Sequence, residues 1–154
     1  MPFHKGHSYC VEFAARECET VYVILFHGGA DEAQILWEHP EWWLSLEERK
    51  KQLQKICDNL KDLADIVPAL IDTSTLRTAE GEEDWDAETP LVRELLGDRL
   101  DAVYSSEPSY GAYFARAYTE AVHRLVDVPR IHYPISGTMI RDMKNEEERE
   151  EWMI

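Results

Sequence analysis

Short apolar runs alternate along this chain with segments in which apolar residues recur every three or four positions. Residues 20–26 (TVYVILF) are β-branched, aromatic or aliphatic almost throughout, which is typical of a strand buried on both faces. In residues 7–18, the side chains of Val11, Ala14 and Cys18 share one face, which predicts an amphipathic helix. The same patterns predict further strands at 65–71, 101–105 and 124–127, and further helices at 45–60, 89–96, 110–120 and 137–143.

Capping and helix-breaking residues set the expected boundaries. Ser45 and Glu48 match the S-x-x-E capping box, which predicts a helix that begins at Ser45. Pro90 suits the first turn of a helix, and Gly97 suits its C-terminal stop. Pro68 lacks a backbone donor and therefore weakens the prediction of a strand around it.

The alternation of strands and helices at this spacing predicts βαβ units, with a parallel sheet and helices on both of its faces. The 154 residues fit one domain, so we expect a single doubly wound α/β domain over residues 1–154. Ligands of such sheets bind at the carboxyl ends of the strands. Candidate functional residues are therefore expected in the turn 105–107 and just before the 7–18 helix.

The charge balance excludes several classes of protein. Lys and Arg total 16 and Asp and Glu total 31, a net charge of −15, so we expect neither a nucleic-acid partner nor a polybasic membrane contact. The apolar content of 44% is that of a packed globule, and neither a bilayer-spanning run nor a signal peptide is present. Three cysteines without a C-x-x-C pair indicate a chain without a disulfide framework, in a reducing cytoplasm.

The first motif that carries chemistry is P-F-H-K-G-H, residues 2–7, at the start of a predicted helix. A helix N-terminus binds phosphate through its free N–H groups, and Gly6 lets the backbone approach a ligand closely. His4 and His7 can face the same phosphate and donate hydrogen bonds to developing charge. Two alternatives are a capped helix start with exposed histidines, and a metal site with Cys10, which lacks a fourth ligand.

The second motif is I-S-G-T-M-I-R, residues 135–141. Ser136 can cap a helix, Gly137 and Thr138 expose N–H groups, and Arg141 can reach back as a bidentate phosphate clamp. Taken alone, this segment also fits a plain N-cap followed by a surface arginine.

Together the two motifs resemble those of the nucleotidyltransferase superfamily, whose members carry H-x-G-H near the N-terminus and I-S-x-T-x-I-R near the C-terminus. Within it the chain is most similar to the nicotinamide-mononucleotide (NMN) adenylyltransferases, in particular the adenylyltransferase domain of bifunctional bacterial enzymes that also carry a ribosylnicotinamide kinase. Three further stretches fit the family: S-S-E-P-S-Y-G at 105–111, V-D-V-P-R at 126–130, and E-D-W-D at 83–86, where the family has a tryptophan-containing nicotinamide site.

The resemblance implies a Rossmann-like, doubly wound parallel sheet in three α/β/α layers, and transfer of AMP from ATP to the 5′-phosphate of NMN, giving NAD and pyrophosphate. A Mg²⁺ ion would bridge the ATP phosphates with few or no protein ligands. The catalytic residues would be His4, His7 and Arg141, and the ATP-binding residues Phe3, Lys5, Gly6, Ser136, Gly137 and Thr138. The residues expected to bind the acceptor substrate are Arg49, Trp85, Asp86, Ser106, Glu107 and Arg130.

Several alternatives stay open. Trp85 can stack on a cationic nicotinamide ring or anchor a polar loop. Arg49 can face the site or be a solvated surface arginine. Trp42 and Trp43 fit an oligomer contact, a lid or local packing. The acceptor can instead be phosphopantetheine, FMN or a substrate of cytidylyl transfer, and a nucleotide-binding module without turnover is the alternative from another class.

The chain departs from the family pattern in three places. A strand and a G-x-F turn normally precede the first motif, but here Met1 adjoins it, so we expect the first strand to be missing from this chain. A start assigned too late explains this better than a real loss, because a loss leaves a row of unpaired backbone groups. Glu88 stands where the family often has a second tryptophan, and we expect no kinase domain within these 154 residues. The acidic runs 80–88 and 142–151 fit solvated surface.

Overall fold

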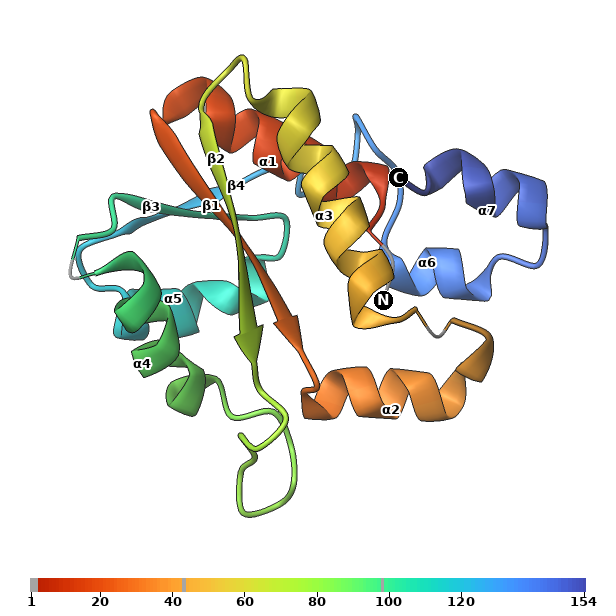
Figure 1. The fold of residues 1–154 in the computed structure, drawn as a ribbon, viewed down its shortest axis with the longest axis horizontal. Helices are drawn as coiled ribbons and strands as arrows, with labels where there is room; N and C mark the ends of the chain where they lie inside the picture. The colour runs from red at the N-terminus through yellow and green to blue at the C-terminus, as the bar shows by residue number, and fades with distance from the viewer. Residues whose placement is uncertain (1–2, 43, 98) are drawn as a thin grey trace.

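The computed structural model describes residues 3–42, 44–97 and 99–154, and its strands pair in parallel within two small sheets. Strands β1 (Thr20–His27) and β2 (Asp65–Asp72) pair along their whole length, in a register that matches Thr20 with Asp65. Strands β3 (Ala102–Ser105) and β4 (Val122–Leu125) form the other parallel pair (Figure 1). The structure therefore confirms the α/β class and the parallel pairing.

Helices lie on both faces of the β1–β2 pair. Helices α1 and α3 pack against β1, and α3 also packs against β2, whereas α4 and α5 supply apolar side chains to the opposite face. The helices are α1 (Lys5–Glu17), α2 (Ala30–Glu38), α3 (Leu46–Leu60), α4 (Trp85–Leu96), α5 (Gly111–Ala117), α6 (Gly137–Asp142) and α7 (Glu146–Trp152), with 3₁₀ turns η1 (Pro40–Trp42) and η2 (Pro108–Tyr110).

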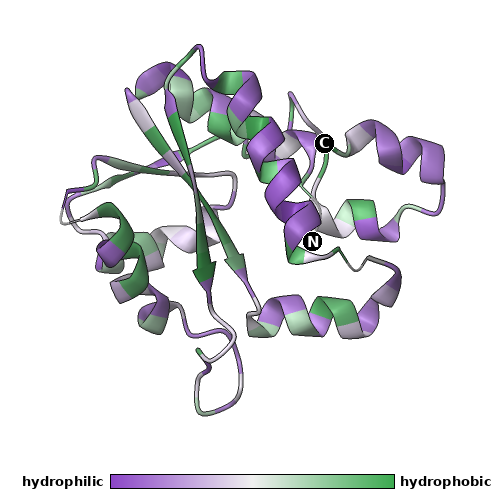
Figure 2. Ribbon diagram, in the orientation of Figure 1, coloured by the Kyte–Doolittle hydropathy of each residue, from purple (hydrophilic) through white to green (hydrophobic). Residues whose placement is uncertain are grey.

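Strand β1 contributes side chains to the core on both faces, but only Leu25 in it is buried and Tyr22 is 42% exposed, so the predicted burial on both faces holds only in part. Leu25 packs against Leu53 and Cys57 of α3, whereas Ile24 and Phe26 join a second core cluster built around Ile71 of β2, Val92 of α4 and the buried Tyr118. Figure 2 shows the hydrophobic residues concentrated along β1 and β2. The alternation of a strand places successive side chains on opposite faces, so a continuous apolar run serves both helical layers.

The single continuous sheet that the sequence predicts is divided in two. No strand of the described residues joins β1 to β3, and the order is β1–β2 in one sheet and β3–β4 in the other. Helix α1 packs against both β1 and β3 and so links the two sheets.

Several predicted boundaries are wrong, and one helix was not predicted. Helix α4 begins at Trp85, after the N-cap Asp84, so Pro90 lies inside it and not in its first turn. Strand β4 begins at Val122 and ends at Leu125, two residues earlier than predicted at each end. A helix, α2, occupies Ala30–Glu38, where none was expected. The acidic run near the C-terminus includes helix α7, whose N-cap Asn145 accepts from two backbone amides.

The C-terminal segment packs beside the start of α1. Met153 forms a bridge with His4, and the amide of Ile154 donates to the carbonyl of Phe3 over 3.3 Å. Trp152 packs on the cluster of Ile135 and Ile140. All three cysteines are free thiols. In the described ranges no helix combines the length and the apolar character that crossing a bilayer requires.

Candidate functional site

The two sequence motifs lie against each other although some 130 residues separate them. A methyl group placed on Gly6, at the start of α1, would lie 3.7 Å from Cγ2 of Ile135, the residue that precedes Ser136. The rings of Tyr9 and Tyr133 are 5.2 Å apart one helical turn further on. Ile135 is fully buried, so the contact between the motifs is part of the core.

His4 and His7 form a capping box at the start of α1. Nδ1 of His4 accepts from the amide of Gly6 over 3.1 Å, and Nδ1 of His7 accepts from the amide of His4 over 3.2 Å. The two rings are stacked, with centroids 3.8 Å apart. Both rings are thereby fixed in orientation by the backbone of the helix that they cap.

The same hydrogen bonds determine where the ring protons lie. A neutral imidazole whose Nδ1 accepts a hydrogen bond carries its proton on Nε2. Burial, followed by the positive charge of Arg130, lowers the pKa of His4 to about 4. Desolvation by the surrounding protein atoms, followed by His4 and Arg130, lowers the pKa of His7 as well, although this residue reaches the protein surface. Both histidines are therefore neutral donors through Nε2 at pH 7.

A tight turn brings Arg130 to the same place. Asp127 and Arg130 both have left-handed backbone conformations, with φ of 49° and 52°. The Asp127 carboxylate accepts from the amides of residues 131–133, which fixes the turn and lowers the pKa of this carboxyl despite some burial. The Arg130 guanidinium donates to the carbonyl of Ile135 over 2.5 Å. The V-D-x-x-R stretch thus connects the two motifs.

The second motif adds hydroxyls and a guanidinium. Ser136 caps α6, because its Oγ accepts from the amide of Met139 over 3.2 Å. Arg141 reaches back to the Oγ1 of Thr138 over 3.1 Å. Gly137 is the first residue of α6, a helix of six residues. The predicted Ser136 cap and the return of Arg141 toward the start of the helix are both confirmed.

A separate cavity of about 370 Å³ lies at the carboxyl ends of β1 and β2. Its aromatic wall is built on Trp85, whose ring meets Tyr110 and Tyr113 edge-on with centroids 5.0 and 5.1 Å away. The Tyr113 hydroxyl donates to the Trp85 carbonyl over 2.9 Å, which holds the start of α4 against α5. The carboxylates that line the cavity come from Asp31, Glu32, Glu83 and Glu88.

Two of these carboxyls share one environment. Glu83 accepts from the amide of Asp31 over 3.0 Å. Burial and the hydrogen bond and charge of Glu83 raise the pKa of Glu88 to about 8. Glu88 is 8% exposed, so the prediction that the whole acidic run 80–88 is solvated surface is wrong at this position. We call the cavity and its Trp85, Glu83 and Glu88 side chains the acidic-aromatic pocket.

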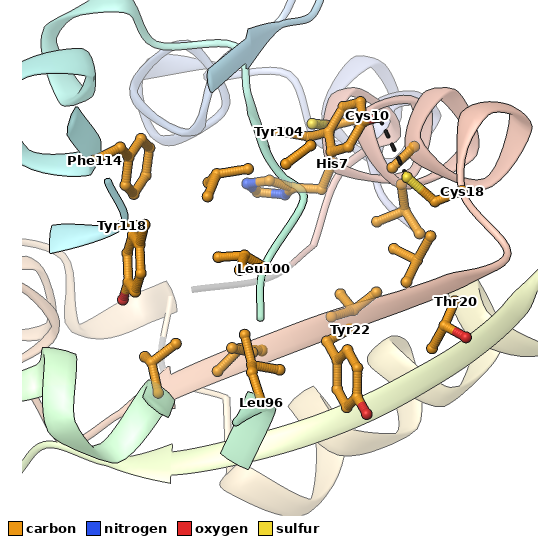
Figure 3. Close-up of a pocket in the computed structure, with 18 of the residues that line it drawn as sticks. His7, Cys10, Cys18, Thr20, Tyr22, Leu96, Leu100, Tyr104, Phe114 and Tyr118 are labelled. Atoms are coloured by element: carbon orange, nitrogen blue, oxygen red, sulfur yellow. Dashed lines mark hydrogen bonds between the residues drawn. The ribbon is translucent and has the colours of Figure 1, made fainter. Parts of the chain in front are cut away.

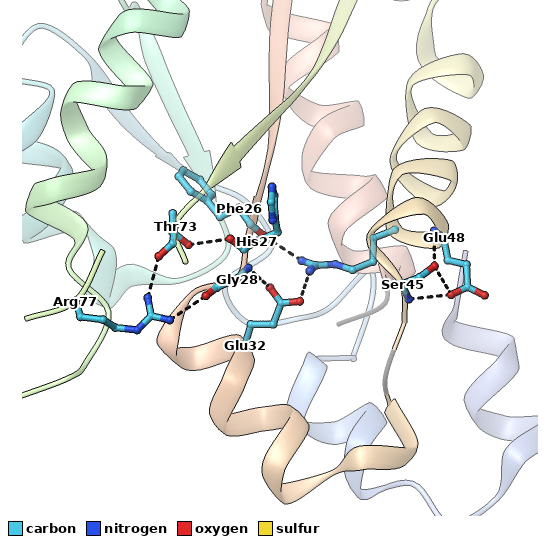
Figure 4. Close-up of polar contacts among 9 residues, drawn as sticks. Phe26, His27, Gly28, Glu32, Ser45, Glu48, Thr73 and Arg77 are labelled. Atoms are coloured by element: carbon cyan, nitrogen blue, oxygen red, sulfur yellow. Dashed lines mark hydrogen bonds and ion pairs between the residues drawn. The ribbon is translucent and has the colours of Figure 1, made fainter. Parts of the chain in front are cut away.

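Arg49 borders this pocket but is neither solvated nor unpaired. Its guanidinium forms an ion pair with Glu32 and donates to the carbonyl of Phe26 over 3.1 Å, and it is 7% exposed. Glu32 in turn accepts from the amide of Gly28 over 2.7 Å (Figure 4). The alternative of a solvated surface arginine is therefore wrong, and Arg49 ties α3 to the end of β1 and to α2.

The other predicted site residues lie at several different places in the fold. Phe3 lies between the sites: its amide donates to the Gln52 side chain over 3.1 Å and its ring meets His7 edge-on. Lys5 lies 5.8 Å from the centre of the Trp152 ring. Ser106 and Glu107 follow β3, where Glu107 caps η2 through the amide of Ser109.

Asp86 does not line the acidic-aromatic pocket. It forms an exposed ion pair with Arg116 over 2.7 Å. The sequence analysis missed Glu83, Tyr110 and Tyr113 as site residues, although E-D-W-D and S-S-E-P-S-Y-G place them beside predicted ones. Trp43 and the Trp42 side chain, with their proposed roles, lie outside the described residues.

No family model matches this chain, and no curated protein matches it. Among residues 3–42, 44–97 and 99–154, no group of three or more His, Cys, Asp or Glu side chains is placed to hold a metal ion. The described residues place the imidazoles of His4 and His7 and the Arg130 guanidinium near the start of α1, Arg141 beside Thr138 on α6, and carboxylates and aromatic rings at a second location.

Proposed function

We propose that the chain is a nucleotidyltransferase that transfers AMP from ATP to the 5′-phosphate of NMN, with release of NAD and pyrophosphate. The observation that carries the proposal is the contact between the H-x-G-H and I-S-x-T-x-I-R segments through Gly6 and Ile135. Two segments that are distant in sequence, and whose side chains suit phosphate binding, therefore lie next to each other. The expected cytoplasmic compartment and the possibility of a homo-oligomer belong to the same proposal.

In the proposed reaction an oxygen of the NMN 5′-phosphate attacks the α-phosphorus of ATP. The new P–O bond forms as the bond between the α-phosphorus and the bridging oxygen breaks, and that oxygen leaves with its electron pair on pyrophosphate. His4 and His7 donate from Nε2 to phosphate oxygens as negative charge redistributes. Neutral donors whose orientation is already fixed need not reorganise during the reaction. Such preorganisation is the main source of transition-state stabilisation in sites of this kind.

The guanidiniums and hydroxyls have a different task in this proposal. Arg141 and Thr138, already hydrogen-bonded to each other, hold the β- and γ-phosphates and then pyrophosphate. Arg130 adds positive charge beside both imidazoles. A Mg²⁺ ion carried on the triphosphate would neutralise part of its charge.

The acidic-aromatic pocket supports NMN as the acceptor. A pyridinium ring is flat and positively charged, so it gains from the face of Trp85 and from the carboxylate of Glu83. Phosphopantetheine and FMN lack that positive ring and would not gain from these carboxylates. The pocket and the cavity that His7 borders share Phe26 and Phe114, so the two cavities adjoin each other.

The fold that we propose with this function is a doubly wound, Rossmann-like sheet in three layers. Parallel pairing in both small sheets and helices on both faces of β1 support it. Both sites also lie where such a sheet binds ligands, beyond the carboxyl ends of its strands.

The test is pyrophosphate release from ATP or CTP with NMN, FMN or phosphopantetheine as acceptor. We expect turnover with ATP and NMN, and weaker binding of reduced NMN, whose ring is uncharged and otherwise matched. Glu83→Gln should raise the KM for NMN several-fold and leave that for reduced NMN unchanged, whereas exposed Glu82→Gln should change neither. Turnover with FMN or phosphopantetheine but not with NMN would show that NMN is not the acceptor. ATP binding without any turnover would favour a nucleotide-binding module.

A further inference from the structure

Two carboxyl groups in the acidic-aromatic pocket share one proton. Glu88 on α4 is buried, and its side chain hydrogen-bonds to Glu83, which lies just before that helix. Glu83 is held in place, because one of its oxygens accepts from the amide of Asp31 and a methyl group on Gly29 would collide with the other. Two carboxylates at this separation repel each other, and a hydrogen bond between carboxyl groups requires a proton on one of them.

The surroundings of Glu88 keep that proton on the pair at pH 7. Burial is the largest cause, followed by the hydrogen bond and charge of Glu83, and then by the charges of Asp84 and Asp31, and together they raise the pKa of Glu88 to about 8. Asp84 is the N-cap of α4, and Asp31 lies in the first turn of α2. Negative groups thus act on Glu88 from its own helix and from α2.

The positive group that borders the pocket is already neutralised. Arg49 of α3 lines the pocket and forms an ion pair with Glu32 of α2. The polar groups that line the pocket from the other side are the hydroxyls of Tyr110, Tyr113 and Tyr118, and phenols are uncharged at pH 7. The pocket therefore retains an excess of negative charge even while Glu88 is protonated.

No further charge reaches Glu88 from behind the aromatic wall. Phe114 and Tyr118 line both this pocket and an adjoining cavity of about 410 Å³, and Figure 3 shows the two rings at one end of that cavity. Within the described chain, no Asp, Glu, Lys or Arg lines the adjoining cavity. Arg93 of α4 lies over the Tyr118 ring and is paired with Glu120.

A second observation indicates that a ligand occupies the pocket. Arg49 is 7% exposed, and its two terminal nitrogens donate to Glu32 and to the carbonyl of Phe26. Its Nε atom is buried and has no hydrogen-bond partner among the described residues. Buried donors are normally satisfied, so this N–H calls for an acceptor oxygen on the ligand. A carboxamide oxygen on a flat ring would fit both this donor and the face of Trp85.

We propose that the acidic-aromatic pocket exchanges the proton shared by Glu83 and Glu88 for the positive charge of a flat cationic ring. The ring stacks on Trp85, the O–H bond of the Glu88 carboxyl breaks, and the proton leaves for solvent. One positive charge enters as one leaves, so the net charge of the pocket is unchanged. The inference rests on the proposed function for the kind of ligand, a pyridinium, and adds that a proton is released when it binds.

The test uses the ring alone. The probe is 1-methylnicotinamide, a pyridinium with a carboxamide oxygen and no phosphate, and the matched probe is neutral nicotinamide. Calorimetry on the whole chain at pH 7, in phosphate and in MOPS buffer, counts the protons released, because the observed enthalpy includes the ionisation enthalpy of the buffer. We expect close to one proton released for each 1-methylnicotinamide bound and none for nicotinamide.

The affinity should follow the same exchange. The association constant of 1-methylnicotinamide should rise about tenfold from pH 6 to pH 7, since one proton must leave, and it should level off above the pKa of Glu88. That of nicotinamide should stay constant over this range.

Variants identify the group that loses the proton. Glu88→Gln keeps the size of the side chain without a titrating group, so it should release no proton and bind the cation equally at pH 6 and pH 7. Glu94→Gln, at an exposed position of the same helix, should behave as the unchanged chain. Glu83→Gln leaves an acceptor for the Asp31 amide and offers Glu88 a donor, so proton release at pH 7 should fall by at least half. This second variant keeps the test decisive if Glu88→Gln does not fold.

Release of less than half a proton by the unchanged chain, equal release with nicotinamide, or full release by either Glu88→Gln or Glu83→Gln would overturn the exchange. So would a failure of 1-methylnicotinamide to bind, and if ATP and NMN still gave pyrophosphate, the proposed function would stand without it. A chain that exchanges one proton for the cation but shows no turnover would keep the exchange and refute the transferase.

Discussion

Helices α1 and α3 begin with the same hydrogen-bond arrangement made from different side chains. At α3, Ser45 and Glu48 exchange bonds with each other's backbone over 2.8 and 3.2 Å. At α1, His4 Nδ1 accepts from the amide of Gly6 over 3.1 Å, and His7 Nδ1 accepts from the amide of His4 over 3.2 Å, in a capping box of the same kind. Serine and glutamate are the usual residues of such a box, and histidine is not.

The difference lies in what each box leaves available. The first turn of α3 carries the acidic residues Glu47 and Glu48, which already oppose the positive end of the helix dipole. The first turn of α1 carries none, and its two capping rings retain Nε2–H donors. The comparison indicates that the α3 box stabilises a helix, whereas the α1 box also orients groups that can meet an anion.

The largest effect on stability is expected in α3, the helix whose capping box we assign to stability alone. Arg49→Met removes the buried partner of Glu32 and should lower the free energy of unfolding by about 3–5 kcal/mol, measured by urea denaturation. Lys50→Met, one residue further along α3, breaks only an exposed pair with Glu47 and should cost at most about 0.5 kcal/mol. Equal costs would mean that Arg49 does not anchor α3.

The second effect is on kcat and tests whether the α1 box takes part in the reaction. His7→Ala should lower kcat for pyrophosphate release about 100-fold or more, since it removes a donor oriented toward transferring charge. The control is Glu48→Ala, which removes the equivalent member of the α3 box and should leave kcat unchanged. If both variants retain full turnover in a folded protein, the α1 box is only a helix cap.

The two boxes should also respond differently to acid. The pKa of His4 is about 4 in the folded chain, below its ordinary 6.5, so the unfolded chain binds more protons between these values. Stability present above pH 6.5 should fall as the pH drops toward 4, by up to about 1.4 kcal/mol per pH unit. His4→Asn keeps an acceptor for the Gly6 amide without titrating, so urea denaturation at pH 7, 6 and 5 should show a shallower slope. An unchanged slope would place the titration elsewhere.

The smallest effect is expected at the α3 box itself. Ser45→Ala removes the acceptor of the Glu48 amide and should cost about 1 kcal/mol of stability with no change in kcat. Thermal or urea denaturation beside the pyrophosphate assay separates the two readouts. A variant that keeps its stability but loses turnover would show that the α3 box also contributes to the reaction.

The features that sequence analysis predicted correctly depend on local patterns. The S-x-x-E spacing predicted the cap at Ser45, which is present. The apolar run at β1 predicted packing on both faces, and its side chains join core clusters on both sides although only Leu25 is buried. The meeting of the two motifs follows from a fold rule, because strand-to-helix turns gather at one edge of parallel strands.

Other features depend on tertiary contacts that a local pattern does not contain. Helix α2 has no fully buried residue, and its Trp37 is 87% exposed, so no clear apolar stripe marks it. Pro90 suggested a helix start, but Asp84 caps the helix six residues earlier, and Tyr113 of another helix holds the first helical residue, Trp85, through its carbonyl. Glu88 reads as surface in an acidic run, and only its packing against Glu83 reveals it as part of a pocket.

The position of Trp85 gives the acidic-aromatic pocket an optical property. Its indole is half-buried between Tyr110 and Tyr113, whereas that of Trp37 stands in solvent. An electron-poor ring that stacked on Trp85 would quench the emission of a tryptophan already shielded from water. The chain therefore carries its own fluorescent reporter at the place where acceptor identity would be decided, and no label has to be introduced to follow binding there.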